Sequence, residues 1–289
     1  MKITQMKRDA CRRSKLGIRP NKKRIFSGIV LGVFLSLAGF AGITVFSCDR
    51  EKVMVSERKP QDTQDTKEIL ILETEKHIDA GSEENVTKYL LENFPLVLQE
   101  PELPTGCEIT ALTMALDYYG YPADKITMAA DYLPKAGFEK YYGSDGQLYG
   151  NDLDRFFIGD PFSSTDGLTC GIPALMTAGD QFLNDMGSSL RTRDVSGSSP
   201  EELYGLVAKG QPVVVLVTIS MADRWSTQGW YTESGSYVDW SQNDHGAVLI
   251  GYSETSVTIA DPISGITEYP REQFESVYLS RGQKSLVIE

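Results

Sequence analysis

A thiol, an imidazole and a carboxylate stand where they could form a hydrolytic site, at Cys107, His245 and Asp261. Cys107 follows the irregular stretch Leu103–Gly106, and apolar residues then recur at three-and-four spacing, so a helix is predicted to begin at about Cys107. The unpaired N–H groups and the positive dipole end of a helix N-terminus favour the thiolate, which is the nucleophilic form. A small buried hydrophobic cysteine is the alternative that this segment alone leaves open.

His245 begins an apolar stretch that runs to Tyr252, and Asp261 ends a second stretch that begins at Val257. Four residues join the two, a length that suits an antiparallel β-hairpin. A carboxylate within reach of an imidazole fixes its orientation, and the ring can then take a proton from a thiol. A structural histidine at a strand end is the alternative.

The expected register of this hairpin leaves a gap between the two groups. Pairing the last residue of the first strand with the first residue of the second sets Asp261 opposite Val248, three residues from His245. A bulge, or a bend at Gly246, would close this gap.

The three residues make a nucleophile, a base and an orienting group in that chain order. Gln99 lies upstream of Cys107 and is a candidate side-chain donor to an oxyanion, with the Cys107 backbone N–H as the second donor. The alternative for Gln99 is a polar residue in a surface loop.

These residues and their neighbours resemble a known family. The residues that make this chain similar to that family are Gln99, Leu103–Glu108, Asn243–Gly246, Gly251–Tyr252 and Ile259–Pro262. They look like the papain-like cysteine peptidases related to the double-glycine leader peptidase domain of bacteriocin exporters, and most of all like their secreted or membrane-anchored bacterial relatives. The resemblance covers about residues 96–288.

What the resemblance implies is a papain-like α+β fold with Cys107 as nucleophile, His245 as base, Asp261 as orienting residue and Gln99 as oxyanion donor. The exporters usually carry Asp before the cysteine and a small residue after it, whereas this chain has Gly106 and Glu108. It also has no phosphate-binding Gly-x-x-x-x-Gly-Lys-Ser/Thr loop. Leader processing coupled to transport is therefore not predicted.

The N-terminal segment predicts a membrane anchor. Residues 1–24 hold ten Lys/Arg and one acid, and residues 25–47 hold no charge. We therefore expect a basic cytoplasmic segment at 1–24, a transmembrane helix at 25–47, a polar stalk at 48–85 and a domain outside the cell at 86–289. A cleaved signal peptide, which would make the protein secreted, and lipidation at Cys48 are alternatives, and a nucleic-acid-binding arm is a weaker one.

The net charge of residues 25–289 limits the classes of partner that the outer domain is expected to bind. Removing the ten basic and one acidic residue of positions 1–24 from the chain's 28 and 40 leaves 18 and 39, a net charge of −21. Such a balance argues against nucleic acid or anionic lipid as its partner. A peptide or cell-envelope amide substrate is expected, with no cofactor and no metal site, on the outer face of a bacterial cytoplasmic membrane.

The order of predicted elements indicates α+β, because helices come first and strands later. A long loop rich in Gly, Asp, Tyr and Phe at 134–169 is expected to line a cleft. Helices are predicted at 89–91, 107–119, 126–133, 174–186, 200–209 and 271–278, and strands at 95–98, 212–219, 245–252, 257–261, 266–269 and 285–288.

Three functions are compatible with this pattern. The leading hypothesis is a cell-surface cysteine peptidase or amide hydrolase acting through a covalent acyl-enzyme. A peptide- or glycan-binding module that uses residues 140–162 and the three tryptophans is the main alternative, and an acyl transferase is a third. A structural disulfide between Cys107 and Cys170 would exclude a nucleophilic role for Cys107.

Overall fold

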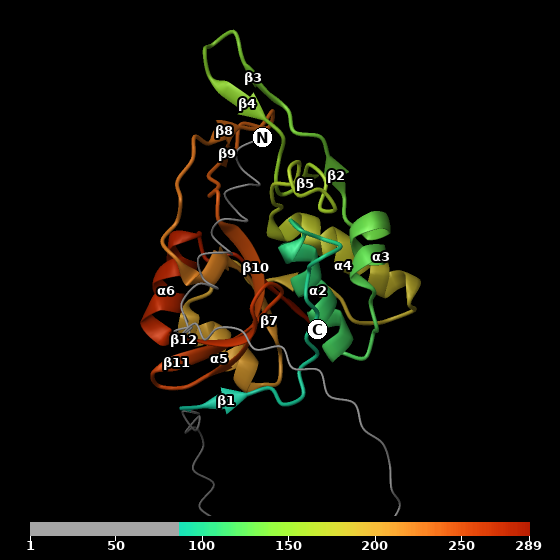
Figure 1. Ribbon diagram of the computed structural model, residues 1–289, viewed down its shortest axis with the longest axis vertical. Helices are drawn as coiled ribbons and strands as arrows, with labels where there is room; N and C mark the ends of the chain where they lie inside the picture. The colour runs from blue at the N-terminus through green and yellow to red at the C-terminus, as the bar shows by residue number, and fades with distance from the viewer. Residues whose placement is uncertain (1–86) are drawn as a thin grey trace, which may run out of the picture. The chain divides into compact units, whose positions relative to one another are not determined.

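Residues 87–289 are described by the computed structural model (Figure 1). The predicted cytoplasmic segment, membrane helix and stalk, at 1–24, 25–47 and 48–85, lie outside the described residues. Within the described part, no helix has both the length and the apolar character needed to cross a membrane.

Helices and strands are arranged in the order that an α+β fold requires. The helices are α2 (Cys107–Tyr118), α3 (Lys125–Thr127), a π-helical turn (Met128–Tyr132), α4 (Ile172–Asp185), α5 (Pro200–Ala208), a 3₁₀ turn (Ile219–Met221) and α6 (Arg271–Ser280). The strands are β1 (Tyr89–Leu90), β2 (Lys135–Ala136), β3 (Lys140–Tyr142), β4 (Leu148–Gly150), β5 (Phe157–Ile158), β6 (Thr192–Asp194), β7 (Val213–Thr218), β8 (Trp230–Tyr231), β9 (Tyr237–Val238), β10 (Asp244–Tyr252), β11 (Ser256–Asp261), β12 (Gly265–Pro270) and β13 (Ser285–Ile288).

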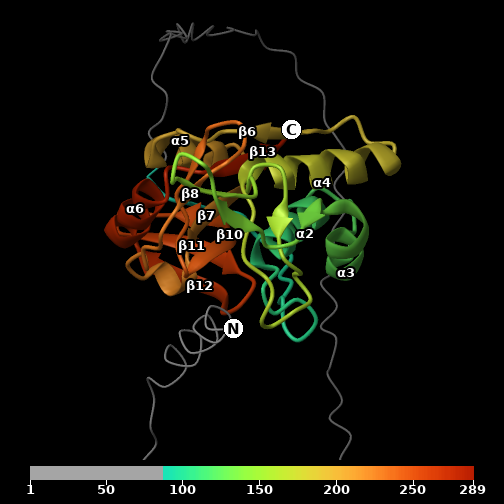
Figure 2. The same cartoon turned by 90° about the horizontal axis from the view of Figure 1, so that it is seen from above.

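The main sheet has the order β12-β11-β10-β7-β13-β6, and β1 pairs with the end of β10. Helices α2, α3 and α4 lie on one side of it and α5 and α6 on the other (Figures 1 and 2). Every residue of β7 and β10 is buried, which is why these strands read as near-continuous apolar runs.

A second sheet, of order β3-β4-β8-β9, forms a lobe that projects from the main sheet at the top of Figure 1. Its strands come from residues 140–150 and 230–238, so two loop regions far apart in the chain build it together. A small apolar cluster of its own, which includes Trp230 and Trp240, lies beneath it. The expected loop at 134–169 is therefore partly sheet, with strands of two or three residues that are too short to show a hydrophobic period.

The longer elements confirm the sequence pattern. Helix α2 begins at Cys107, and the chain turns at Gly120 with a positive φ of 81°. Helix α5 is capped at Ser199 by a capping box with Glu202, and β13 has the predicted bounds Ser285–Ile288.

Two short predictions near the start of the domain are wrong. Residues 89–91 contain β1 rather than a helix, because Tyr89 and Leu90 pair with Tyr252 and Gly251 at the end of β10. Residues 95–98 form no strand, and Leu96 and Leu98 are about half exposed. Two-residue pairing at a sheet edge depends on the partner strand, which a local pattern does not reveal.

Gly246 sets how closely α2 approaches β10. A Cβ at this position would lie 2.5 Å from Glu108 Cα and 2.9 Å from Glu108 N, so no side chain fits between the strand and the first turn of the helix. We expect Gly246→Ala to lower the free energy of unfolding by about 3 kcal/mol, measured by urea titration.

Gly205→Ala is the matched control, since a Cβ there meets nothing within 4 Å in the middle of α5. It should raise stability by about 0.5–1 kcal/mol, because alanine is the better helix former. Equal effects of the two substitutions would contradict this account of Gly246.

Candidate active site

The loop before α2 is held in place from several directions, and it delivers Cys107 to the helix N-terminus. Leu103 N donates to Gln99 O at 2.9 Å and Gly106 N donates to Leu103 O at 3.1 Å. The Thr105 side chain is buried, and its hydroxyl donates to the backbone carbonyls of Asp160, Pro161 and Ser163. Gly106 is the N-cap residue and offers no side chain, so no side chain caps the N–H groups in the first turn of α2.

Cys107 is buried, with 3% of its surface exposed. No disulfide joins it to Cys170. The sulfur therefore stays a thiol or thiolate, which leaves the nucleophilic interpretation open.

His245 and Asp261 come together as the hairpin prediction requires. His245 Nε2 lies 3.1 Å from Asp261 Oδ1, and both side chains are almost fully buried. This is the distance of a salt bridge between an imidazolium and a carboxylate. Nδ1 has no hydrogen-bond partner among residues 87–289, so this nitrogen is left for the thiol or a substrate.

The gap in the predicted register is closed by a β-bulge, at Ile250 rather than at Gly246. Tyr252 pairs with Val257 as predicted, but Ile250 is an extra residue in β10, so that Val248 pairs with Ala260. Asp261 is thus shifted by one residue toward His245.

This shift decides which face of the sheet carries the carboxylate. Continuing the register beyond Val248 and Ala260 sets Asp261 opposite Ala247, two residues from His245 and on the same face. In the register without a bulge, Asp261 would oppose Val248 and point to the other face. The bulge is therefore required for the contact between the imidazole and the carboxylate.

Burial and mutual attraction perturb both groups. Burial of the His245 ring by itself lowers its pKa, but the negative charges of Asp261 and Cys107 outweigh it and raise the pKa of His245 well above its usual 6.5. Burial of Asp261 acts to raise its pKa, but the charge and hydrogen-bonding of His245 and the backbone N–H groups of Ile263 and Ser264 lower it to about 2. The two residues therefore form an ion pair near neutral pH.

Gln99 lies next to this pair through its backbone. Gln99 N donates to Pro262 O at 2.8 Å, directly after Asp261. Its side-chain Nε2 donates to Pro104 O at 3.1 Å, within the loop that leads to Cys107. Gln99 therefore lies in the loop that leads to Cys107, with one of its two amide N–H groups already engaged and its Oε1 buried without a partner in the described part of the chain.

Two polar groups at the site were not assigned a role from the sequence. Glu108 is fully buried and bonds to Cys107 and Thr169, and Asp244 forms a buried ion pair with Arg281 at 2.6 Å. The Asp244 pair fixes the start of β10 just before His245. A glutamate in the first turn of an apolar helix was a visible signal, whereas the partner of Asp244, just past the end of α6, was not.

Comparisons with known proteins agree with this geometry. A family profile described as the Peptidase_C39 like family matches residues 91–286. The chain is 28% identical over 193 residues to the uncharacterized protein YvpB of Bacillus subtilis strain 168. The matched region covers 66% of this chain and 72% of YvpB.

One solved structure supports the same assignment. A protein described as a C39-like peptidase from Bacillus anthracis shares 31% identity with a TM-score of 0.61, covering 70% of this chain and 97% of that one. The peptidase domain of Streptococcus ComA, a bi-functional ABC transporter involved in a quorum-sensing pathway, shares 14% identity with a TM-score of 0.38, over 68% of this chain and 96% of that domain.

Proposed function

Because the chain belongs to the Peptidase_C39 like family, we propose that it is a cysteine peptidase or amide hydrolase acting through a covalent acyl-enzyme. The observation that carries the proposal is the buried His245–Asp261 ion pair at 3.1 Å beside a cysteine thiol at a helix N-terminus. A nucleophile, a proton donor and an orienting carboxylate are the groups that acyl transfer requires.

The proposed reaction has two halves. The Cys107 thiolate attacks the carbonyl carbon of the scissile amide, and the carbonyl electron pair moves onto oxygen. As the C–N bond breaks, the protonated His245 ring gives its proton to the leaving nitrogen. The neutral ring then takes a proton from water, which attacks the thioester and releases the acid, the thiolate and the protonated ring.

The oxyanion formed in each half needs donors. In this proposal they are the Cys107 backbone N–H and the second amide N–H of Gln99, the one not bonded to Pro104. In the proposed reaction Asp261 holds the ring by its Nε2, and Nδ1 is the nitrogen that serves the sulfur and the leaving group.

The predicted anchor at 25–47 supports the further proposal that the domain acts on the outer face of a bacterial membrane, on a peptide or cell-envelope amide. Protease treatment of intact cells tests this location, since an outer domain is released and a cytoplasmic one is protected.

The function itself is tested by incubating wild-type and Cys107→Ala protein side by side with a peptide library and with an alkylating probe. Mass spectrometry of the quenched wild-type reaction should show an acyl adduct on Cys107. Turnover without any dependence on Cys107 would refute the proposal.

A second candidate, peptide or glycan binding by the projecting lobe, is favoured by a row of tyrosines. Strands β3, β4, β8 and β9 each contribute one tyrosine at paired positions, and neighbouring rings along the row are 5.7, 6.4 and 5.1 Å apart. We call these four residues, Tyr141, Tyr149, Tyr231 and Tyr237, the tyrosine row. Rings with a polar edge suit contact with a peptide or a sugar.

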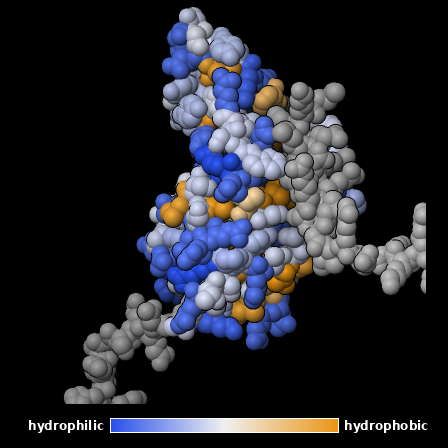
Figure 3. Space-filling model, turned by 60° about the vertical axis from the view of Figure 1, so that its left-hand side comes forward, coloured by the Kyte–Doolittle hydropathy of each residue, from blue (hydrophilic) through white to orange (hydrophobic). Residues whose placement is uncertain are grey.

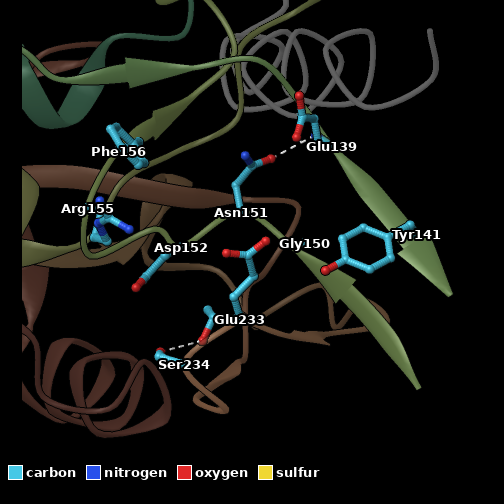
Figure 4. A pocket seen from close by; sticks show the side chains of 10 residues that line it. Glu139, Tyr141, Gly150, Asn151, Asp152, Arg155, Phe156, Glu233 and Ser234 are labelled. Atoms are coloured by element: carbon cyan, nitrogen blue, oxygen red, sulfur yellow. Dashed lines mark hydrogen bonds between the residues drawn. The ribbon is translucent and has the colours of Figure 1, made fainter. Parts of the chain in front are cut away.

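A polar pocket adjoins this row (Figure 4). Tyr141 lines it together with the side chains of Glu139, Asn151, Asp152 and Glu233. The surrounding surface of the lobe is mostly hydrophilic (Figure 3). Aromatic faces beside convergent polar groups are typical of ligand sites.

Binding to the inactive Cys107→Ala protein separates this candidate from hydrolysis. We expect Tyr141→Ala to weaken binding of soluble cell-wall fragments or library peptides by about tenfold or more, measured by calorimetry. Tyr142→Ala is the matched control, because Tyr142 is exposed on the same strand but points to the opposite face. Equal losses in the two variants, or no binding at all, would rule out the tyrosine row as the binding surface.

A further inference from the structure

Glu108 places a carboxyl group against the nucleophile. It directly follows Cys107 in the first turn of α2 and has no exposed surface. Cys107 Sγ donates to Glu108 Oε2 at 3.2 Å, and Thr169 Oγ1 donates to Oε1 at 2.5 Å. Both carboxyl oxygens are therefore engaged, one of them by the sulfur atom.

Packing does not explain why this residue is acidic. Burying a carboxylate costs several kcal/mol, and a glutamine of nearly the same shape would fill the space. The positive end of the α2 dipole is adjacent, and the same small cavity is lined by Arg281 and Lys284 together with Asp239 and Asp244.

The His245 ring is not a free acceptor for the thiol proton. Its pKa is raised well above 6.5, and Asp261 is ionised because its pKa is lowered to about 2. The ring therefore already carries its proton near neutral pH. A thiolate and a carboxylate 3.2 Å apart in a buried site would repel each other strongly, so one proton must lie between Sγ and Oε2.

We propose that Glu108 is a second proton-exchange partner of the nucleophile, whose carboxylate takes the Cys107 thiol proton while His245 keeps its own for the leaving group. This inference rests on the proposed hydrolytic function. In the step, the S–H bond breaks, sulfur keeps the electron pair and an O–H bond forms at Oε2, with no other reactant. The protonated carboxyl then donates a hydrogen bond to the thiolate.

The groups that face this Cys107–Glu108 pair come from five parts of the fold. Asp261 of β11 lies behind the imidazole ring. The others line the cavity beside Glu108, and they are His245, Asp244, Cys170, Asp239, Arg281 and Lys284.

Glu108→Gln tests the proposal, because glutamine keeps the size of the side chain but can neither take the proton nor carry a charge. The measurement is the rate of Cys107 alkylation by iodoacetamide as a function of pH. Without an acceptor for its proton and without the hydrogen bond from the protonated carboxyl, the thiolate forms less readily, so the midpoint of the profile should move about one unit higher and the rate on its acid side should fall about tenfold. An unchanged or downward-shifted midpoint would overturn the proposal.

Thr113→Val is the matched control, since Thr113 is buried further along α2 and bonds only to Ile109 O among the described residues. Its alkylation profile should match the wild type, and a shift equal to that of Glu108→Gln would overturn the proposal as an effect of helix stability.

The wild-type protein offers a measurement that does not depend on the folding of a variant. Alkylating Cys107 removes the sulfur as a proton partner, so the infrared difference spectrum should show a change in one buried carboxyl, absent in Cys107→Ser. A spectrum without a carboxyl change would overturn the proposal. Alkylation needs no substrate, so a wild type that cleaves nothing refutes the proposed function alone, and an unchanged profile in an active enzyme refutes the Glu108 role alone.

Discussion

Cys107→Ala is expected to reduce hydrolysis by about four or more orders of magnitude while the domain stays folded. The thiolate sulfur is the atom that bonds to the substrate in the proposed reaction. Hydrolysis of a fluorogenic peptide selected from the library gives kcat/KM for both proteins. Circular dichroism confirms the fold of the variant.

Cys170→Ala is the control for this experiment, since Cys170 is the other buried cysteine of the described domain. It should keep both activity and alkylation at Cys107. Full activity in Cys107→Ala, or loss of labelling only in Cys170→Ala, would move the nucleophile away from Cys107.

Asp261→Asn is expected to have the second largest effect, on activity and on stability. Asparagine cannot balance the charge of the His245 ring, so kcat should fall by about 10²–10⁴. Breaking a buried ion pair from one side should also lower the free energy of unfolding by on the order of 3 kcal/mol near neutral pH, measured by urea titration.

The pH dependence of that loss follows from the two pKa shifts. The raised pKa of His245 stabilises the folded state fully below its unfolded value of 6.5, and this contribution is lost as pH rises through the higher folded value. The lowered pKa of Asp261 stabilises the folded state above its unfolded value of 3.8, and this contribution is lost as pH falls toward about 2. The difference between wild type and Asp261→Asn should therefore be greatest from about pH 4 to about pH 6.5.

Asp185→Asn provides the comparison, because Asp185 is exposed and bonds only to the Tyr132 hydroxyl among the described residues. It should change stability by less than about 0.5 kcal/mol at every pH. If wild type and Asp261→Asn have the same free energy of unfolding between about pH 4 and about pH 6.5, the ion pair contributes nothing to the stability of the fold.

Much of the site could be predicted from the sequence, because long-range contact between His245 and Asp261 is encoded in one short hairpin. The start of α2 at Cys107 follows from local periodicity and the glycine before it. The expected register called for a bulge or a bend, but the position of the bulge at Ile250 could not be predicted, because it depends on how β10 pairs with β11 and, beyond the bulge, with β1.

The second sheet, which forms the projecting lobe, could not be predicted from the sequence for a different reason. Its strands are two or three residues long and pair across about 80 residues of chain, as Tyr149 does with Tyr231. Glu108 was visible as a departure from the related exporters, but its contact with Thr169 depends on tertiary packing.

The bulge in β10 also constrains how relatives of this chain can diverge. One added residue reverses which side of a strand faces the imidazole. Whether the number of residues between the histidine and the aspartate is odd or even therefore matters as much as the number itself. A relative that lacks the bulge must gain or lose an odd number of residues in the hairpin to keep its carboxylate on the histidine. Alignments that place a single-residue gap between positions 245 and 261 can therefore be checked for a compensating gap before the aspartate is assigned.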